Sequence, residues 1–326
     1  MLRTMNYDGT LQVDLPTSAI PVLLEQPDTL LWVDIHGDPT DDEVALLRET
    51  FGFHPLAIDD ALEEAHLPKI HDRAAYLYLV VHAVHCEAEQ CDQVTTQELD
   101  IFLGPNYLIT YQATPLPTVD RVWETCQRDS RVLHRGPAHL LYRLVDDLIA
   151  EYLPLIDKLD NAIDAAEDEV FDTPEADLLE RIFALKRTLL RLRRILGPQR
   201  EVLNKLARGD FPVLPEKEEV YFRDIYDHLV RIYDITDGLR DLVGGVLDTY
   251  LSVVNNRMNE VMKMLTIITT LFMPLSFLVG FFGMNFFEAS AAFPAWTSTT
   301  ALVTLLVLMV ILPVGMYLWM QRRHLL

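Results

Sequence analysis

The chain has 326 residues, of which 50% are hydrophobic, and its formal net charge is −22 at pH 7. So high an apolar share in so acidic a chain indicates water-facing and membrane segments within one protein. The charge is also uneven, because Glu288 is the only charged residue between Met264 and Gln321. An acidic water-facing body repels phosphates, so the composition argues against a nucleic-acid partner and favours metal cations or a solvated surface.

Residues 1–137 are predicted to form an α/β domain. The segments LLWVDIH and AAYLYLVVHAV are rich in branched and aromatic residues, which is typical of strands. The segments VTTQELDIFLG and NYLITYQ predict a further pair of strands, separated by Gly104, Pro105 and Asn106. The segment TDDEVALLRETF predicts a short helix that starts at an Asp or Thr cap.

Residues 138–263 are predicted to be helical. The stretch from Ala138 to Phe171 repeats apolar residues at helical spacing, and Thr173-Pro174 separates it from a second helical stretch. From about Lys217 one helix is expected to run to Phe282, with Gly244-Gly245 as its weakest point. At 1.5 Å per residue such a helix is about 100 Å long. A helix of this length requires bundling with copies of itself.

Two apolar segments predict a transmembrane hairpin in residues 264–326. The first span covers about 264–282, the outer loop 283–296 and the second span about 297–320, and each span is long enough for a hydrocarbon core of about 30 Å. Lys263 precedes the hairpin, and Arg322 and Arg323 follow it, whereas the loop carries no positive charge. The positive-inside rule then predicts a multi-pass protein of the cell's inner (plasma) membrane, with both termini and the two preceding parts in the cytoplasm.

A stripe of small, polar and methionine residues follows one face of the first span. Small residues let membrane helices approach closely, so one interpretation is a helix-packing interface. The other is a pore lining, in which parallel copies form polar rings that hold a hydrated ion and hydrophobic rings that gate. The members of the stripe recur at steps of three and four: Asn259, Met262, Leu265, Thr269, Met273, Ser276 and Gly280.

Several segments of the chain resemble the CorA family of divalent-cation channels. The resemblance is carried by YFRDIYDH, by the stretch from Leu247 to Phe286, and by the tripeptide Gly283-Met284-Asn285, which is that family's signature. It extends back through LLYRLVDDLIAEY to LAIDDALEEAHLPKI, so it covers most of the chain. It implies a homopentamer in membrane lipid with a cytoplasmic funnel and a pore lined by the first span. The ion that it implies is Mg²⁺, with Co²⁺ or Ni²⁺ also carried.

The resemblance makes Gly283, Met284 and Asn285 the expected selectivity filter. Mg²⁺ gives up its waters reluctantly, and a ring of Asn285 amides can bond those waters without stripping them. Gly283 lets the chain turn toward the axis. Without the resemblance, an Asn-containing helix C-cap would explain the same residues. The loop departs from the family in having Glu288 as its only acid, so either cation enrichment at the outer mouth is weaker or Glu288 supplies it.

The resemblance also implies regulatory cation sites between neighbouring cytoplasmic domains. Carried over by motif, these sites use Asp59 and Asp60 of LAIDDAL, Asp146 of YRLVDD and Asp224 of YFRDIYDH. Facing carboxylates repel unless a hard divalent cation bridges them, so filled sites would hold the ring closed and empty sites would let it open. Without the resemblance, each would read as a solvated surface acid. Asp248 is either an acidic ring at the inner pore mouth or part of a solvated stalk face.

Two other functions fit the same pattern. A proton-coupled Zn²⁺ importer of the ZntB type shares the architecture, although the strict Gly-Met-Asn argues against it. A membrane-anchored scaffold with a non-conducting pore fits the divergent outer loop. No enzyme is predicted, because the chain has no Gly-rich phosphate loop, nucleophile elbow or zinc-hydrolase helix motif. The sequence leaves the preferred ion open among Mg²⁺, Co²⁺, Ni²⁺ and Zn²⁺.

Overall fold

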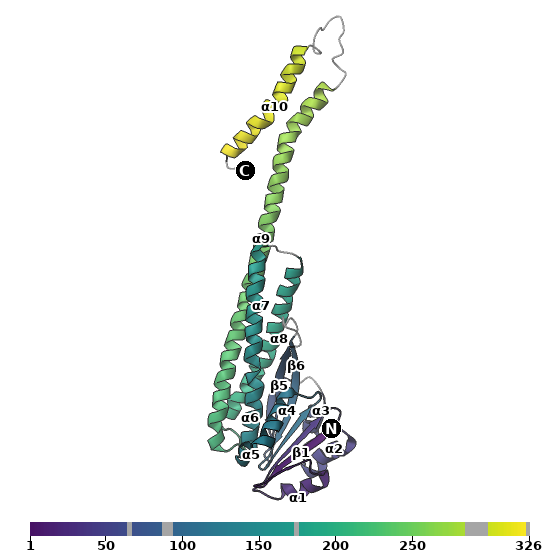
Figure 1. Ribbon diagram of the computed structural model, residues 1–326, viewed down its shortest axis with the longest axis vertical. Coiled ribbons are helices and arrows are strands. Elements are labelled where there is room, and N and C mark those ends of the chain that lie inside the picture. The colour runs from purple at the N-terminus through teal and green to yellow at the C-terminus, as the bar shows by residue number, and fades with distance from the viewer. Residues whose placement is uncertain (64–66, 87–93, 173–175, 284–298, 324–326) are drawn as a thin grey trace. The chain divides into compact units, whose positions relative to one another are not determined.

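A computed structural model of the chain describes residues 1–63, 67–86, 94–172, 176–283 and 299–323 (Figure 1). The chain divides into two units, Met1–Asp248 and Thr249–Leu326. The first unit holds a sheet and the helices that pack on it, and the second holds the end of the longest helix and one further apolar helix. The three-part division predicted from the sequence, with boundaries after residues 137 and 263, stays a prediction.

The strands described in the first unit form one seven-stranded sheet. Its order is β2-β1-β3-β7-β6-β5-β4, and all neighbouring pairs are antiparallel except β3 and β7, which are parallel. The four strand segments predicted from the sequence are confirmed as β3, β5, β6 and β7. The strands are β1 (Leu2–Tyr7), β2 (Leu11–Val13), β3 (Leu30–His36), β4 (Lys69–Asp72), β5 (Leu77–Cys86), β6 (Val94–Leu103) and β7 (Tyr107–Gln112).

Strand β3 is apolar along most of its length because both of its faces are covered. Leu31, Val33 and Ile35 belong to the apolar layer on one face. On the other face Trp32 packs against Trp123 of helix α4 (Pro117–Arg128), with 4.7 Å between the ring centroids. The sheet is therefore the middle of a layered α/β domain, as the sequence predicts.

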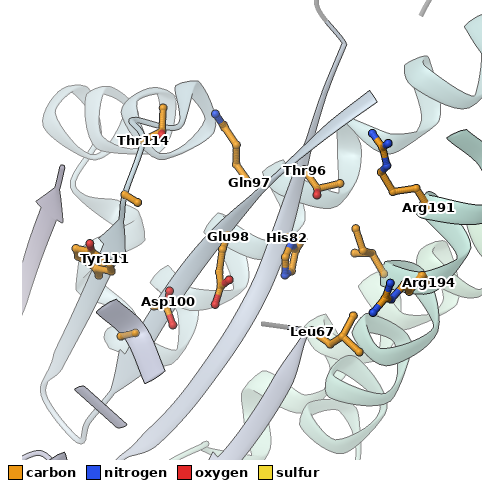
Figure 2. A pocket seen from close by; sticks show the side chains of 13 residues that line it. Leu67, His82, Thr96, Gln97, Glu98, Asp100, Tyr111, Thr114, Arg191 and Arg194 are labelled. Atoms are coloured by element: carbon orange, nitrogen blue, oxygen red, sulfur yellow. The ribbon is translucent and has the colours of Figure 1, made fainter. Parts of the chain in front are cut away.

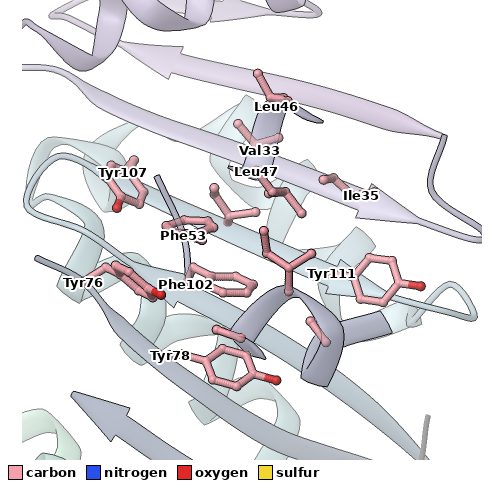
Figure 3. Close-up of a cluster of buried hydrophobic side chains, with 14 of the residues drawn as sticks. Val33, Ile35, Leu46, Leu47, Phe53, Tyr76, Tyr78, Phe102, Tyr107 and Tyr111 are labelled. Atoms are coloured by element: carbon pink, nitrogen blue, oxygen red, sulfur yellow. The ribbon is translucent and has the colours of Figure 1, made fainter. Parts of the chain in front are cut away.

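Three short helices cover the first of these apolar layers, namely α1 (Ile20–Leu24), α2 (Asp41–Ala45) and α3 (Pro55–Leu62). In Figure 3, Phe53 lies on Phe102 of β6, and their ring centroids are 4.3 Å apart. The buried residues of α3 are Ala57, Ile58 and Ala61. Because these three residues face the layer, the acidic pair between them, Asp59 and Asp60, is turned outward.

The rest of the first unit is helical. Helices α7 and α8 pack as a hairpin, in which Arg181 pairs with Glu169 at 2.6 Å. The predicted break at Thr173-Pro174 lies outside the described residues, between the end of α7 and the start of α8. The helices are α5 (Arg131–His134), α6 (Pro137–Ala150), α7 (Tyr152–Asp172), α8 (Ala176–Ala207) and α9 (Glu219–Phe282), with 3₁₀ turns at Thr17–Ala19 and Glu216–Glu218 and a π turn at Leu46–Thr50.

Helix α8 also closes an exposed edge of the sheet. The Gln199 side chain accepts a hydrogen bond from the backbone N–H of His82 at 2.9 Å and donates one to its carbonyl at 3.3 Å. The Tyr152 hydroxyl donates to the same carbonyl at 2.8 Å. Strand β5 extends beyond its partner β4 at this point, so these side chains pair backbone groups that an edge strand would otherwise leave open.

The second unit contains two apolar helical segments, the end of α9 up to Phe282 and α10 (Thr299–Arg322). Both α9 and α10 contain a stretch that is long and apolar enough to cross a membrane. Pro274 and Pro313 lie inside these helices without ending them, as proline does in membrane helices. The long continuous helix predicted from the sequence is confirmed, because α9 runs unbroken through Gly244-Gly245 to Phe282.

Candidate ion pathway and cation sensor

The predicted stripe lies on one continuous face of α9. All seven of its residues are exposed within the chain, including Met262 at 60% and Met273 at 67%. The less exposed residues of the same stretch are Ile267, Thr270, Leu271, Pro274, Leu275 and Leu278. At 100° per residue these lie opposite the stripe, so the stripe keeps a constant phase from Asn259 to Gly280.

The threonine hydroxyl on this stripe already has one partner. The Thr269 hydroxyl donates to the Leu265 carbonyl of the preceding turn at 2.8 Å, and the neighbouring Thr266 does the same to Met262 at 2.7 Å. Such a bond satisfies the donor without help from lipid. The oxygen keeps acceptor capacity, so Thr269 can still receive a hydrogen bond from the water shell of an ion.

Gly283 closes the described part of α9. Its N–H donates to the Val279 carbonyl at 2.9 Å. A Cβ at this position would lie 2.9 Å from the same carbonyl oxygen, a backbone atom that has little room to move. The helix can therefore end as it does only with glycine here. The other predicted filter residues, Met284 and Asn285, and the outer-mouth residue Glu288 lie outside the described residues.

Two of the four predicted sensor carboxylates lie on helices that contact each other within one chain. Asp146 lies on α6 and Asp224 on α9. The pKa of Asp146 is raised, first by burial and then by the charges of Asp147 and Asp224, while Arg143 and His228 oppose the rise. Arg143 also holds the α6 acids directly, at 3.4 Å from Asp146 and 2.9 Å from Asp147.

The other two sensor carboxylates lie on α3. Asp59 is exposed. Asp60 forms an ion pair with Lys69 of β4, with 2.7 Å between Oδ2 and Nζ. Across the described ranges, there is no group of three or more His, Cys, Asp or Glu side chains placed to hold a metal ion. One chain thus supplies two separate acidic elements, α3 on one side and the α6–α9 pair on the other. Asp248, predicted at the inner mouth, is an exposed residue of α9.

The sequence analysis missed a buried acid on the sheet. Asp100 of β6 is 2% exposed, and the Tyr78 hydroxyl donates to it at 2.6 Å. Burial raises the pKa of Asp100 well above its usual range, and the charges of Glu98 and Asp60 act in the same direction. Asp100 is therefore electrostatically linked to a predicted sensor residue. One feature of the sequence could have revealed this acid. Asp100 lies between apolar residues in the strand segment ELDIFL, where a buried position is expected.

A cavity of about 450 Å³ opens beside this buried acid. Figure 2 shows Glu98 and Asp100 on one strand, with Arg191 and Arg194 on the helix across from them. The Arg191 guanidinium donates to the Val94 carbonyl at 2.7 Å. The walls of the cavity thus combine carboxyl groups from the sheet with guanidinium groups from α8.

Comparison with known proteins identifies the relatives of this chain. The family model described as "CorA-like Mg2+ transporter protein" matches residues 27–322. The cobalt/magnesium transport protein CorA of Thermotoga maritima is 38% identical over 289 residues, which cover 87% of this chain and 82% of that protein. The CorA of Methanocaldococcus jannaschii is 26% identical over 259 residues, covering 79% of this chain and 80% of that protein.

Solved structures share the fold of this chain. The complete structure of the CorA magnesium transporter from Methanocaldococcus jannaschii superposes with a TM-score of 0.81, covering 99% of this chain and 98% of that one at 22% identity. The ZntB cytoplasmic domain from Vibrio parahaemolyticus gives a TM-score of 0.60 at 16% identity, covering 79% of this chain and 98% of that one. The full-length match includes the α/β domain, the long helix and the two apolar helices.

Proposed function

Because this chain belongs to the family of CorA-like Mg²⁺ transporter proteins, we propose that it is a membrane channel or transporter for hydrated divalent cations. Mg²⁺ is the main ion, and Co²⁺ or Ni²⁺ are also carried. The observation that carries the proposal is the exposed stripe on α9 that leads to Gly283. Its polar members can hold the water shell of an ion, and its methionines can gate by excluding water.

The pore requires several copies of the chain. One α9 offers one stripe of small, polar and methionine residues, and parallel copies around an axis would turn their stripes inward. We propose a homopentamer in the cell's inner (plasma) membrane, surrounded by lipid, with spans at about 264–282 and 297–320. The positive charges of Lys263 and Arg322 beside the spans support an orientation with both termini in the cytoplasm. The acidic cytoplasmic part attracts divalent cations and offers nucleic acid no binding surface.

Selection takes place at the outer end of the pore. The ring of Asn285 amides bonds the water shell of Mg²⁺, Met284 and Gly283 complete the filter, and Glu288 adds negative charge at the outer mouth. The glycine at 283 supports this assignment, since any side chain there would meet a backbone carbonyl. An ion that keeps its waters avoids the large cost of dehydration, and Mg²⁺ gives up its waters reluctantly.

Cytoplasmic cations close the pore. Asp59 and Asp60 on α3 of one copy face Asp146 and Asp224 of the next, and a bound divalent cation cancels their repulsion. The position of Asp146 and Asp224 about one turn beyond the contact between Tyr142 of α6 and Tyr221 of α9 supports a cation site at this pair. Asp248 adds an acidic ring at the inner mouth. The transported ion is then also its own regulator, through an assembly with two states.

Ion flux through the purified protein in liposomes tests this function. Uptake of Mg²⁺, Co²⁺, Ni²⁺ and Zn²⁺ is measured in parallel, each with and without a pH gradient. The proposal expects Mg²⁺ uptake that does not need the gradient. Zn²⁺ uptake that depends on the gradient would identify a proton-coupled importer instead. Uptake of all four ions at the rate seen in liposomes without protein would identify a non-conducting scaffold.

A further inference from the structure

A fully buried carboxylate lies at the beginning of α9. Glu218 ends the 3₁₀ turn that leads into the helix, and its side chain is 0% exposed. His139 Nδ1 lies 2.9 Å from Glu218 Oε2, and Arg135 Nη2 lies 3.4 Å from Oε1. A buried carboxylate is stable only when it is paired in this way. The start of α9 is thus tied to α6 by a hydrogen bond and to the end of α5 by an ion pair.

The hydrogen bond from His139 has a defined direction. Burial lowers the pKa of His139, Arg135 and Arg143 lower it further, and Glu218 opposes them. The imidazole is therefore neutral near pH 7, and because the Glu218 carboxylate can only accept, Nδ1 carries the hydrogen. The charged and titratable groups around this ring are Arg135, Arg143, Glu218, Tyr142 and Tyr221.

The Glu218–His139 pair is the first of three residue pairs between α6 and the start of α9. Each pair lies about one turn further along both helices, and the three are called levels here. At the next level Tyr142 of α6 meets Tyr221 of α9, with 5.0 Å between the ring centroids. At the third level, Asp146 lies four residues beyond Tyr142 on α6, and Asp224 lies three residues beyond Tyr221 on α9. Along each helix these residues are three or four positions apart, which is one turn. The two helices therefore run side by side in the same direction from the Glu218–His139 pair to the predicted sensor acids.

We propose that Glu218 and His139 are positioning residues for the cation site: they hold the first turns of α9 against α6, so that Asp224 stays opposite Asp146. This inference deepens the proposed function and rests on the claim that Asp146 and Asp224 of one copy bind a divalent cation together with α3 of the next. Without a cation the two acids repel, and the repulsion favours separation of the helices. The pair below them resists that separation and presents both acids already in place, which lowers the cost of binding.

A Mg²⁺ titration of the full-length protein tests this role. The probe is Mg²⁺ alone, and the readout is the Mg²⁺ concentration that gives half-maximal protection of the cytoplasmic part against limited proteolysis. Glu218→Gln removes the charge, and His139→Ala removes the donor. Each is expected to raise the midpoint about tenfold, as loss of a supporting partner does in other metal sites. His139→Asn keeps an N–H near the Nδ1 position and should return the midpoint to within about twofold of wild type.

Glu216→Gln is the matched control, because it makes the same change two residues earlier at an exposed position. It should leave the midpoint unchanged. If Glu218→Gln does not fold, His139→Ala and His139→Asn carry the test. Midpoints equal to wild type in both His139→Ala and Glu218→Gln, alongside a lower melting temperature, would overturn the proposal and leave the pair a purely structural one. If wild type itself shows no Mg²⁺ protection, the proposed sensor has failed instead.

Discussion

Asp100 lies in an environment that disfavours the ionised form of its carboxyl group. It is almost fully buried on β6, and the Tyr78 hydroxyl donates to it. Burial is the main cause of its raised pKa, and Lys69 only partly offsets the effect. In the unfolded chain the pKa of the same carboxyl is near its ordinary value of 3.8. Between these two pKa values the folded protein binds a proton that the unfolded chain has lost.

Stability should therefore fall as the pH rises through this window. The stabilising effect of the bound proton is complete below the unfolded pKa and is lost as the pH rises through the raised folded pKa. Asp100→Asn removes the titration and should melt at a higher temperature than wild type at pH 8, with a difference that shrinks toward pH 5. Each unit of pKa difference corresponds to about 1.4 kcal/mol. Thermal melts of the full-length protein from pH 5 to 8 measure the effect.

The exposed Asp157 provides the control for this experiment. Asp157→Asn makes the same chemical change on α7 and should show the wild-type pH dependence. If melting curves of Asp100→Asn and wild type shift in parallel over the whole pH range, Asp100 does not hold a proton in the fold. Its hydrogen bond to Tyr78 would then be that of an ordinary buried carboxylate.

At the residue scale, the sequence could name only residues that a family motif carries. Asp146 and Asp224 were selected in this way, and their role as cation ligands stays a prediction. Asp100 and the pair of His139 and Glu218 belong to no motif. Their roles depend on which face of a strand or helix is covered, and that is decided by the register of β5 on β6 and by the packing of α6 on α9. Neither can be read from one sequence.

At the scale of elements, α9 joins the soluble and apolar parts without a break. Its stripe faces away from the less exposed residues of the same helix. Both a packing interface and a pore lining would use such a face. The two interpretations differ in the expected effect of replacing a stripe residue by a smaller one. In a packed interface it leaves a void that destabilises the assembly. In a hydrophobic ring it widens the ring, so water enters more easily.

Met273→Ala should therefore raise the resting leak of Mg²⁺. Met273 is 67% exposed on the stripe, and Met262 and Leu265 are expected to form further hydrophobic rings. The leak is measured as flux into liposomes at a Mg²⁺ concentration that closes the wild-type pore. Leu278→Ala is the control, since Leu278 lies on the less exposed face and should not alter conduction. Unchanged flux in Ala variants of all three stripe positions would place the pore on the other side of the helix.

Element boundaries follow from local chemistry where breakers and caps exist. Helix α2 begins at a capping box in which Glu43 N–H donates to the Thr40 hydroxyl at 3.3 Å, as the segment TDDEVALLRETF predicts. Strand β1, with the sequence LRTMNY, was not predicted, because its apolar residues do not alternate. Pairing with β2 and β3 makes it a strand. Gly244-Gly245 does not interrupt α9, because a helical glycine costs only about 1 kcal/mol.

At the scale of the whole molecule, the proposed sensor works only between copies of the chain. One chain provides α3 with Asp59 and Asp60, and it provides the α6–α9 pair with Asp146 and Asp224. A cation that joins the two elements across a subunit boundary favours the closed ring, by an amount set by its different affinity for the two states. Several weak sites can together supply the roughly 5.5 kcal/mol that moves a population from mostly open to mostly closed.

Two substitutions of Asp224 should have opposite effects on closure of the pore. Asp224→Lys places a positive charge beside Asp60 of the next copy, imitates a bound cation and should keep the pore closed at low Mg²⁺. Asp224→Ala removes a ligand and should weaken Mg²⁺ protection against proteolysis. Flux and proteolysis are measured over one Mg²⁺ titration. Asp234→Ala, an exposed acid of the same helix, is the control. Protection that is identical in wild type and Asp224→Ala would show that Asp224 is not part of the sensor.

Mg²⁺ uptake into liposomes by Asn285→Ala tests the central claim most directly, because the claim is that a ring of Asn285 amides selects a hydrated cation at the outer end of the α9 pore. The account predicts that uptake falls to the protein-free rate while the variant assembles as wild type does in cross-linking. Asn256→Ala makes the same change outside the stripe and should conduct normally. Uptake by Asn285→Ala at the wild-type rate would contradict the account. It would show that Gly283-Met284-Asn285 serves only to end the helix.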